Sequence, residues 1–96
     1  MLREKAPAKV AESARSRALR RAAASFPTTF GPRLQRLRVA AGFGQPAFAQ
    51  HCGISVRSLS RYENNTTMPS PPVLLLLAAG LDVAPSVLLG VTQSRD

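Results

Sequence analysis

The C-terminal two-thirds of the chain carries apolar residues at helical spacing in short runs, and each run is bounded by Gly, Pro, Ser or Asn. The first run contains Leu34 and Leu37, which lie about one helical turn apart. Pro32 suits the first position of a helix, and Gly42 suits the residue just beyond a helix end. The pattern therefore predicts a first helix over about residues 32–41.

Four more helices follow from the same reasoning. Gly53 ends a second helix, and Ser55 is a good N-cap for a third. The proline pair at 71–72 opens a fourth helix, and Gly90 closes a fifth. The predicted ranges are about 45–52, 56–63, 71–81 and 85–89. Five short helices joined by tight turns indicate an all-α fold, compact over residues 31–90.

The first thirty residues lack such a pattern. Residues 1–25 are rich in Ala, Arg, Ser and Lys, and their bulky apolar side chains are only Leu2, Val10 and Leu19. With so little to bury, this stretch cannot offset its ordering entropy as an independent core. Pro27 also disfavours helix at the residue before it, so residues 25–31 are expected to form a linker. We therefore expect a basic, mobile or marginally helical arm with its linker (1–30), a helical domain (31–90) and a tail (91–96).

The charge of the chain points to an anionic partner. Among 96 residues there are 13 Lys and Arg and only 5 Asp and Glu, which gives a net charge of +8 at pH 7. No acidic residue lies between Glu12 and Glu63, so the positive potential belongs to the first two-thirds of the chain. Nucleic acid is the commonest large anionic partner of such a protein. The basic arm is then either a solvated tail or a second element that contacts phosphates or the minor groove.

Several classes of protein are excluded by what the sequence lacks. One Cys and one His cannot build a disulfide framework or a tetrahedral zinc site, and we expect neither a metal nor a cofactor. The longest apolar run, residues 73–81, is far shorter than the ~20 residues that span a bilayer, and the N-terminus has no apolar signal region. The sequence has no paired carboxylates, no activated nucleophile and no phosphate-binding Gly loop, so nothing in it suggests an enzyme. A cytoplasmic protein without membrane contact is expected, associated with a bacterial or phage nucleoid.

The segment from Gln45 to Asn64 meets the demands of a helix-turn-helix. Two helices that cross steeply need a small residue where they touch, and Ala49 supplies it. The turn needs a residue that tolerates positive φ, and Gly53 follows four residues later. Leu59, six residues beyond that glycine, can pin the second helix to the first, while Ile54 fills the apolar position of the turn.

The flanks of this segment resemble those of the Cro/phage-repressor class of helix-turn-helix proteins, also called the Xre family. The similar stretches are G-P-R-L-Q-R-L-R-V-A-A-G-F-G-Q, S-R-Y-E-N-N-T-T-M-P-S and L-A-A-G-L-D-V-A-P-S-V-L-L-G. Together they cover about residues 30–90 and leave the arm unexplained. The resemblance implies a five-helix, lambda-repressor-like domain that binds double-stranded DNA and regulates transcription, as a repressor.

By this resemblance, the helix predicted over 56–63 is the recognition helix, and its groove-facing residues are Val56, Arg57 and Arg61. The two arginines are four residues apart and share a face, and Arg is the best single reader of guanine. Val56 offers only an apolar contact, for instance to a thymine methyl group. Phosphate contacts are expected from Gln45, at the start of the helix predicted over 45–52. They are also expected from short polar side chains along the recognition helix and at its ends, namely Ser55, Ser58, Ser60 and Asn64.

Arg38 and Glu63 correspond to an Arg–Glu pair of the family that links the first helix to the end of the third. A separate reason supports the pair. Glu63 stands among arginines, and an acid on a DNA-facing surface would repel phosphate. We therefore expect Glu63 to have a structural partner.

The leucine-rich run before Asp82 suggests an interface. Its stripe of core residues is Leu74, Leu77, Ala78 and Leu81, so Leu76 must point elsewhere. Leu76 and Val87 occupy positions where the family commonly carries Lys or Glu, and exposed apolar patches often mark interfaces. We expect a homodimer through these two residues. The alternatives are that a neighbouring domain or the basic arm covers this face.

A second reading of the function belongs to another class. An antitoxin-like or accessory module would use the helices predicted over 71–81 and 85–89 to hold a partner protein. Both functions can reside in one chain. A purified monomer that precipitates without a partner would favour this alternative over the DNA-binding regulator.

Overall fold

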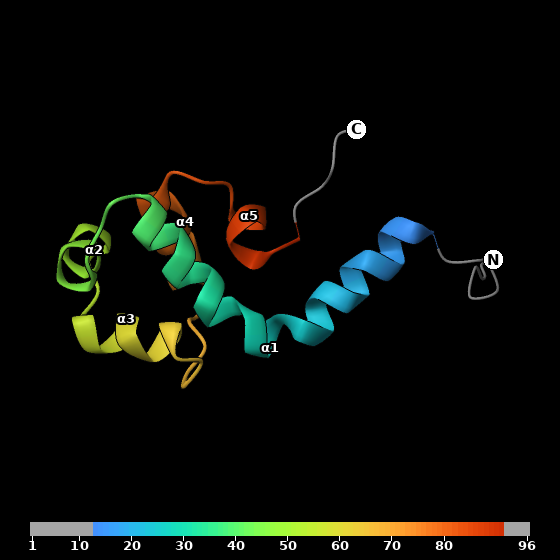
Figure 1. The fold of residues 1–96 in the computed structure, drawn as a ribbon, viewed down its shortest axis with the longest axis horizontal. Coiled ribbons are helices and arrows are strands. Elements are labelled where there is room, and N and C mark those ends of the chain that lie inside the picture. Colours follow the sequence, from blue (N-terminus) through green and yellow to red (C-terminus); the bar gives the residue numbers. More distant parts are fainter. Residues whose placement is uncertain (1–12, 92–96) are drawn as a thin grey trace, which may run out of the picture.

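The structure, a computed structural model, describes residues 13–91 and contains five helices and no strand within that range (Figure 1). The helices are α1 (Ala14–Ala40), α2 (Gln45–Cys52), α3 (Val56–Glu63), α4 (Pro71–Leu81) and α5 (Pro85–Leu89). The predicted all-α fold is confirmed, and α2 to α5 have the predicted bounds. Residues 1–12 of the expected arm and 92–96 of the expected tail lie outside the described residues. No helix of the described part is long and apolar enough to cross a membrane.

The bounds of the short helices follow from local chemistry. The Oγ of Ser55 accepts a hydrogen bond from the backbone N–H of Ser58 at 3.0 Å and so caps the start of α3. Gly53 ends α2 with a φ of +78°, and Gly90 ends α5 with a φ of +77°, both in the left-handed region that glycine adopts without strain. α4 has Ser70 as its N-cap and two prolines in its first turn.

The core forms where α1 runs across the other helices. α1 packs against α3 and α5, α2 packs against α3 and α4, and α4 packs against α5. The largest side chains that are fully buried in this core are Phe30, Phe48, Leu34, Leu59, Leu77 and Leu88. Removing such side chains from water is the main driving force for folding a domain of this size.

The predicted linker over residues 25–31 is wrong, because α1 begins at Ala14 and continues for 27 residues through Pro27 and Pro32. The aromatic rings of Phe26 and Phe30, one turn apart, lie 5.0 Å from each other between centroids, and Phe30 is fully buried. Burial of these rings favours the helical path. The helix changes direction near its middle, in teal, and its N-terminal half projects away from the other helices (Figure 1).

The side chain of Asn65 bonds two backbone groups of α1, one of which Pro32 leaves without its usual donor. In a regular helix the carbonyl of Thr28 accepts from the N–H of residue 32, which Pro32 lacks. Here the Nδ2 of Asn65 donates to that carbonyl at 3.2 Å. The Oδ1 of the same amide accepts from the N–H of Gly31 at 2.8 Å. Asn65 itself adopts a φ of +59°, which Asn tolerates better than most residues.

Gly31 allows α1 to approach the end of α3 closely. A Cβ at this position would collide with the backbone carbonyl oxygen of Glu63 and would lie 2.6 Å from the Oδ1 of Asn65. Both obstacles are held in place, since Glu63 is buried and Asn65 is hydrogen-bonded to α1. A side chain at position 31 would therefore push the two helices apart.

Cys52 is buried between α2 and α4, close to Gly80, where a Cβ would lie 2.5 Å from its Sγ. Burial raises the pKa of the Cys52 thiol, because the charged thiolate is poorly solvated there. The thiol thus remains protonated and unreactive near neutral pH. The neighbouring His51 is exposed and stacks on the ring of Phe43, with 5.0 Å between ring centroids.

We predict that Gly31→Ala lowers the free energy of unfolding by about 2–4 kcal/mol, because the new methyl group forces apart two packed helices. Urea denaturation monitored by circular dichroism measures the effect. Gly44→Ala is the matched control, since a Cβ there meets only the Cδ of Pro46 at 4.0 Å. The control should cost less than about 1 kcal/mol. Equal losses in the two variants would contradict the close approach of α1 and α3.

Candidate nucleic-acid interface

The outer face of α3 carries the side chains that the sequence assigned to base contacts. Arg57 and Arg61 are exposed, and Val56 is 42% exposed. Leu59, on the opposite side of the same helix, is fully buried. α3 thus presents a strongly amphipathic surface, with one apolar side in the core and one basic side toward solvent.

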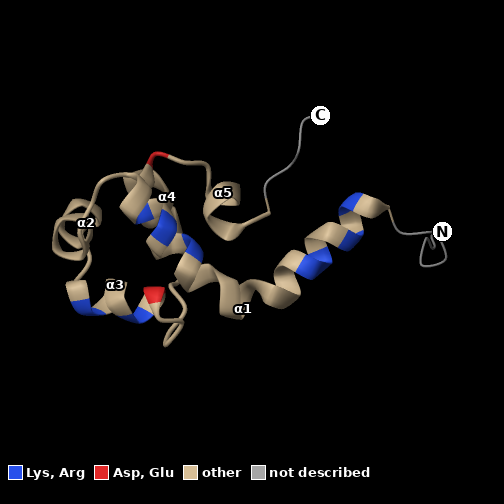
Figure 2. Ribbon diagram, viewed as in Figure 1, with Lys and Arg blue, Asp and Glu red and all other residues tan. Residues whose placement is uncertain are grey.

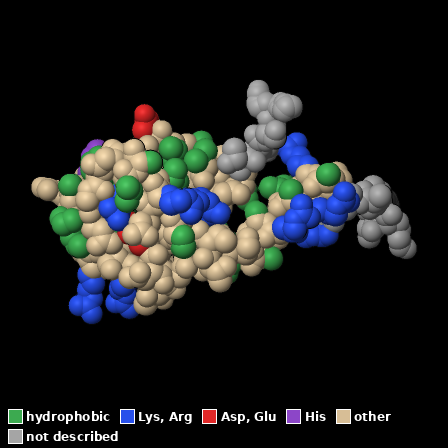
Figure 3. Space-filling model, in the orientation of Figure 1, with side chains coloured by type: hydrophobic (Ala, Val, Ile, Leu, Met, Phe, Trp, Pro, Cys, Tyr) green, Lys and Arg blue, Asp and Glu red, His purple; other side chains and the backbone are tan. Residues whose placement is uncertain are grey.

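Basic residues dominate the surface near α3. The structure places only two acidic residues among residues 13–91, and Figure 2 shows them at the end of α3 and in the loop between α4 and α5. The first, Glu63, is buried, so its carboxylate does not face solvent. Lys and Arg side chains project below α3, and further groups lie over α1 (Figure 3). Such a surface attracts a polyanion.

Glu63 accepts hydrogen bonds from two other helices. The Nε of Arg38 on α1 lies 2.6 Å from its Oε2, and the Nη2 of Arg38 donates to its Oε1 at 3.1 Å. The Nε2 of Gln45, the first residue of α2, donates to the same Oε1 at 2.9 Å. The side chains of Arg38 and Glu63 are only 8% and 3% exposed. One carboxylate therefore ties the end of α3 to α1 and to the start of α2.

Arg38 also fixes the turn between α1 and α2. Its Nη1 donates to the backbone carbonyl of Phe43 at 2.7 Å. The guanidinium thus uses three of its nitrogens in hydrogen bonds, two of them to Glu63. This geometry is rigid and bidentate, which lysine could not reproduce.

The polar residues assigned to phosphate contact lie at the ends of α2 and α3. Ser55 and Ser58 bond to each other through their hydroxyl groups at 2.9 Å, at the start of α3. The Nδ2 of Asn64 donates to the Oγ of Ser60 at 3.4 Å, at the other end of α3. Gln45 is half-buried, and its Nε2 has a second hydrogen beyond the one given to Glu63. Contact of these five residues with phosphate stays a prediction.

Asn65 is the positioning residue that sequence reasoning missed. It lies just beyond α3, in the loop N-N-T-T, and its side chain bonds to α1 as described above. The combination of an Asn at a turn with two prolines inside an expected helix is the signal that could have indicated it. Such a link cannot be assigned without knowing which segments meet.

The residues assigned to an interface lie on different helices. Leu76 of α4 is 47% exposed, and its neighbour Leu75 is 58% exposed. Val87 of α5 is half-buried and lines a groove beside α1, which Leu76 does not line. An interface through these residues remains a prediction.

The arrangement of α2 and α3 defines a helix-turn-helix protein. Residues 29–92 match the family described as "Helix-turn-helix domain", and the chain belongs to that family. The resemblance to the Cro/phage-repressor class is confirmed.

Among solved structures, the chain is similar to the restriction-modification controller protein C.AhdI from Aeromonas hydrophila. The two are 32% identical in sequence with a TM-score of 0.63, over 65% of this chain and 94% of the other. No curated protein sequence matches the chain. The family and this likeness support a DNA-binding transcriptional regulator.

We predict that Glu63→Gln lowers the free energy of unfolding by about 3–5 kcal/mol, because it leaves the charge of Arg38 buried without a counter-ion. Chemical denaturation measures the loss. Asp82→Asn is the control: it removes an exposed carboxylate at a residue with positive φ, which Asn also tolerates, and should change stability by less than about 0.5 kcal/mol. If Glu63→Gln cost no more than the control, the pair would not be the constraint described here. Replacing both partners, as Arg38→Met with Glu63→Leu, should recover part of the loss.

Proposed function

We propose that this protein binds a specific DNA sequence with α3 in the major groove and represses transcription by occluding promoter DNA. The observation that carries the proposal is the basic outer face of α3, where Arg57 and Arg61 are exposed while the opposite face is buried. A two-turn helix fits the major groove, and each arginine can donate two hydrogen bonds to O6 and N7 of a guanine. Val56 adds an apolar contact at the edge of this face.

Affinity and selectivity come from different residues in this proposal. Phosphate contacts by Gln45, Ser55, Ser58, Ser60 and Asn64 would fix the position of the domain on the duplex without reading sequence. The excess of arginine supplies long-range attraction that weakens as salt rises. Only the contacts of α3 distinguish one sequence from another. Membership of a family of DNA-binding regulators supports this role over a catalytic one.

We predict that Arg57→Ala and Arg61→Ala each cost about 1–3 kcal/mol of specific binding, concentrated at one base position apiece. The binding site is first obtained by selection from a randomised duplex pool at two salt concentrations. Titration of the selected duplex and of substituted duplexes then gives the loss at each base.

Arg36→Ala is the matched control for these variants, because it removes the same charge from an exposed site on α1. It should weaken binding to all sequences slightly and leave the preference unchanged. If either α3 variant weakened selected and random DNA equally, its arginine would not read a base. If the pool yielded no preferred sequence, the proposal of a specific regulator would fail.

We also propose that the protein acts as a homodimer, since a pair of α3 helices would read two half-sites about 34–36 Å apart. The exposed leucines of α4 favour self-association, and Val87 of α5 is the second expected contact. C.AhdI is a restriction-modification controller protein, and symmetric dimers are the commonest assemblies of identical soluble chains.

We predict that Leu76→Ser combined with Val87→Ser lowers the dimer fraction without unfolding the chain. Sedimentation velocity measures the oligomeric state, and circular dichroism checks the fold. Leu19→Ser, at another exposed apolar residue on α1, should leave the dimer fraction unchanged. A wild-type protein that is monomeric at high concentration would remove the dimer proposal and favour a separate partner protein for α4 and α5.

A further inference from the structure

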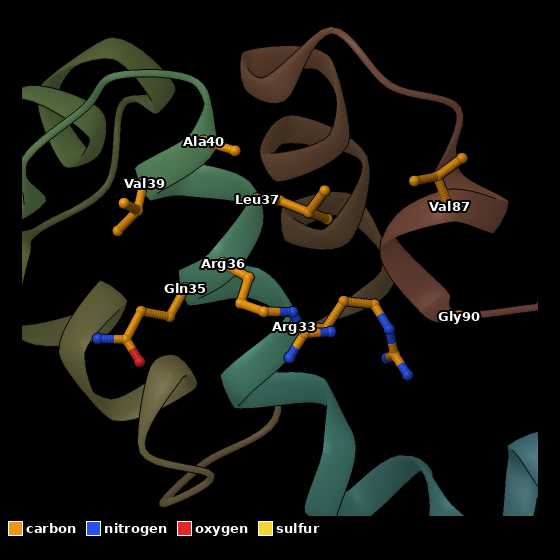
Figure 4. Close-up of a pocket in the computed structure, with 8 residues that line it drawn as sticks. All are labelled: Arg33, Gln35, Arg36, Leu37, Val39, Ala40, Val87 and Gly90. Carbon is orange, nitrogen blue, oxygen red and sulfur yellow. The ribbon is translucent and has the colours of Figure 1, made fainter.

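A groove is formed by side chains of α1 and of the end of α5, two helices that pack against each other. Its volume is about 720 Å³. The residues that form its walls include Arg33, Arg36, Leu37, Val39, Val87 and Gly90. Figure 4 shows the side chains of Arg33 and Arg36 reaching from α1 toward α5, with Leu37 and Val87 above them. None of these residues belongs to the expected base or phosphate contacts.

The charge of the groove has no counterpart in the described part of the chain. Neither Arg33 nor Arg36 forms a salt bridge within residues 13–91, where the carboxylate of Glu63 is occupied by Arg38 and Gln45. The Nη2 of Arg33 donates to the Oγ1 of Thr29 at 3.3 Å. Its Nη1 is buried and has no acceptor. A buried N–H without an acceptor is costly, so the guanidinium of Arg33 has neither a counter-charge nor a full set of acceptors among residues 13–91.

The backbone of α5 makes room for this guanidinium. Gly90 has a φ of +77°. A Cβ added there would collide with the Cζ and Nη2 of Arg33 and would lie 2.8 Å from its Nε. The glycine therefore both ends α5 and lets the arginine lie against it. The position of Arg33 is set by this packing and by Thr29, so the unpaired Nη1 is held in a fixed place.

The remaining walls of the groove are apolar apart from Gln35. Val39 is 60% exposed, and Leu37 and Val87 are half-buried. An apolar wall contributes little to binding a phosphate backbone, whose contacts are polar and hydrated. It does favour a ligand that brings an apolar side chain together with its carboxylates.

We propose that this groove binds an acidic, amphipathic segment of another protein. A carboxylate of the partner accepts from Arg33 and Arg36, where two guanidinium groups offer charge-assisted and bidentate hydrogen bonds. An apolar side chain one turn away packs on Leu37 and Val87, in the manner of a helix that lies in a groove. The groove shares no residue with the expected DNA contacts of α3, whereas it includes Val87, so the partner and a second copy of this chain would compete for that residue.

The test uses a synthetic amphipathic peptide of about 14 residues, four helical turns, with Leu along one face and Glu beside it. Fluorescence anisotropy of the labelled peptide measures its affinity for the full chain, and backbone amide shifts locate the site. A peptide with every Glu replaced by Gln is the ligand control. The key variant is Arg36→Gln, since Arg36 is exposed and its loss should not disturb the fold. Arg57→Gln removes the same charge from α3 and is the matched protein control.

We expect the peptide to shift only the amides of α1 and α5 around the groove. Arg36→Gln should lower the affinity for the acidic peptide by about fivefold or more, and replacing every Glu of the peptide by Gln should do the same. Arg57→Gln should change the affinity by less than about twofold. Equal losses in the two arginine variants would show general attraction to a basic protein and overturn the site. Absence of shifts at the groove would overturn it as well. If a short DNA duplex shifted the same amides and displaced the peptide, the groove would be part of the DNA surface instead.

Discussion

The ion pair between Arg38 and Glu63 is the constraint on which the position of α3 and its basic outer face depends. α3 has only eight residues, and a helix of that length is unstable alone in water. It is held at one side by Leu59 in the core and at its end by the carboxylate that α1 and α2 share. Removing two charges from water is expensive, and an apolar pair of similar volume can be as stable. We interpret the pair as a device for orientation, because a bidentate contact allows one rotation of α3 and an apolar contact allows several.

The same constraint explains the separation of charges along the chain. Within residues 13–91, Glu63 is the one acid close to the basic face of α3, and its burial keeps negative charge from that face. The cost of burying the carboxylate is offset within the protein by Arg38 and Gln45. The face that meets solvent then carries arginine without a competing acid, as a DNA-binding surface requires.

The sequence predicts most of this architecture because the deciding signals are local. Glycines with positive φ end α2 and α5, and serine N-caps begin α3 and α4, so these signals lie next to the helix ends that they define. The outward direction of Arg57 and Arg61 follows from the register of a single helix.

What the sequence could not reveal depends on contacts between distant segments. The path of α1 through two prolines rests on an amide 34 residues away in sequence, and no local rule assigns that partner. The sequence predicts that Gln45 begins a helix, as it does. The bond of Gln45 to Glu63 depends on α2 and α3 packing together, which no local pattern indicates. The groove of Arg33 likewise needs α1 and α5 side by side. Taken alone, the sequence of α1 indicates a solvated basic helix, and that of α5 indicates an apolar turn.

The amide of Asn65 also makes four positions depend on one another, namely 28, 31, 32 and 65. Pro32 leaves the carbonyl of Thr28 for Asn65 to bond, and Gly31 leaves the space that the amide fills. A residue with an N–H at position 32 would compete for that carbonyl, and a side chain at 31 would expel the amide. Substitutions at these sites are therefore tolerated together or not at all. A residue with an N–H in place of Pro32 would remove the need for an amide at position 65, whereas α1 needs that amide as long as it carries Pro32.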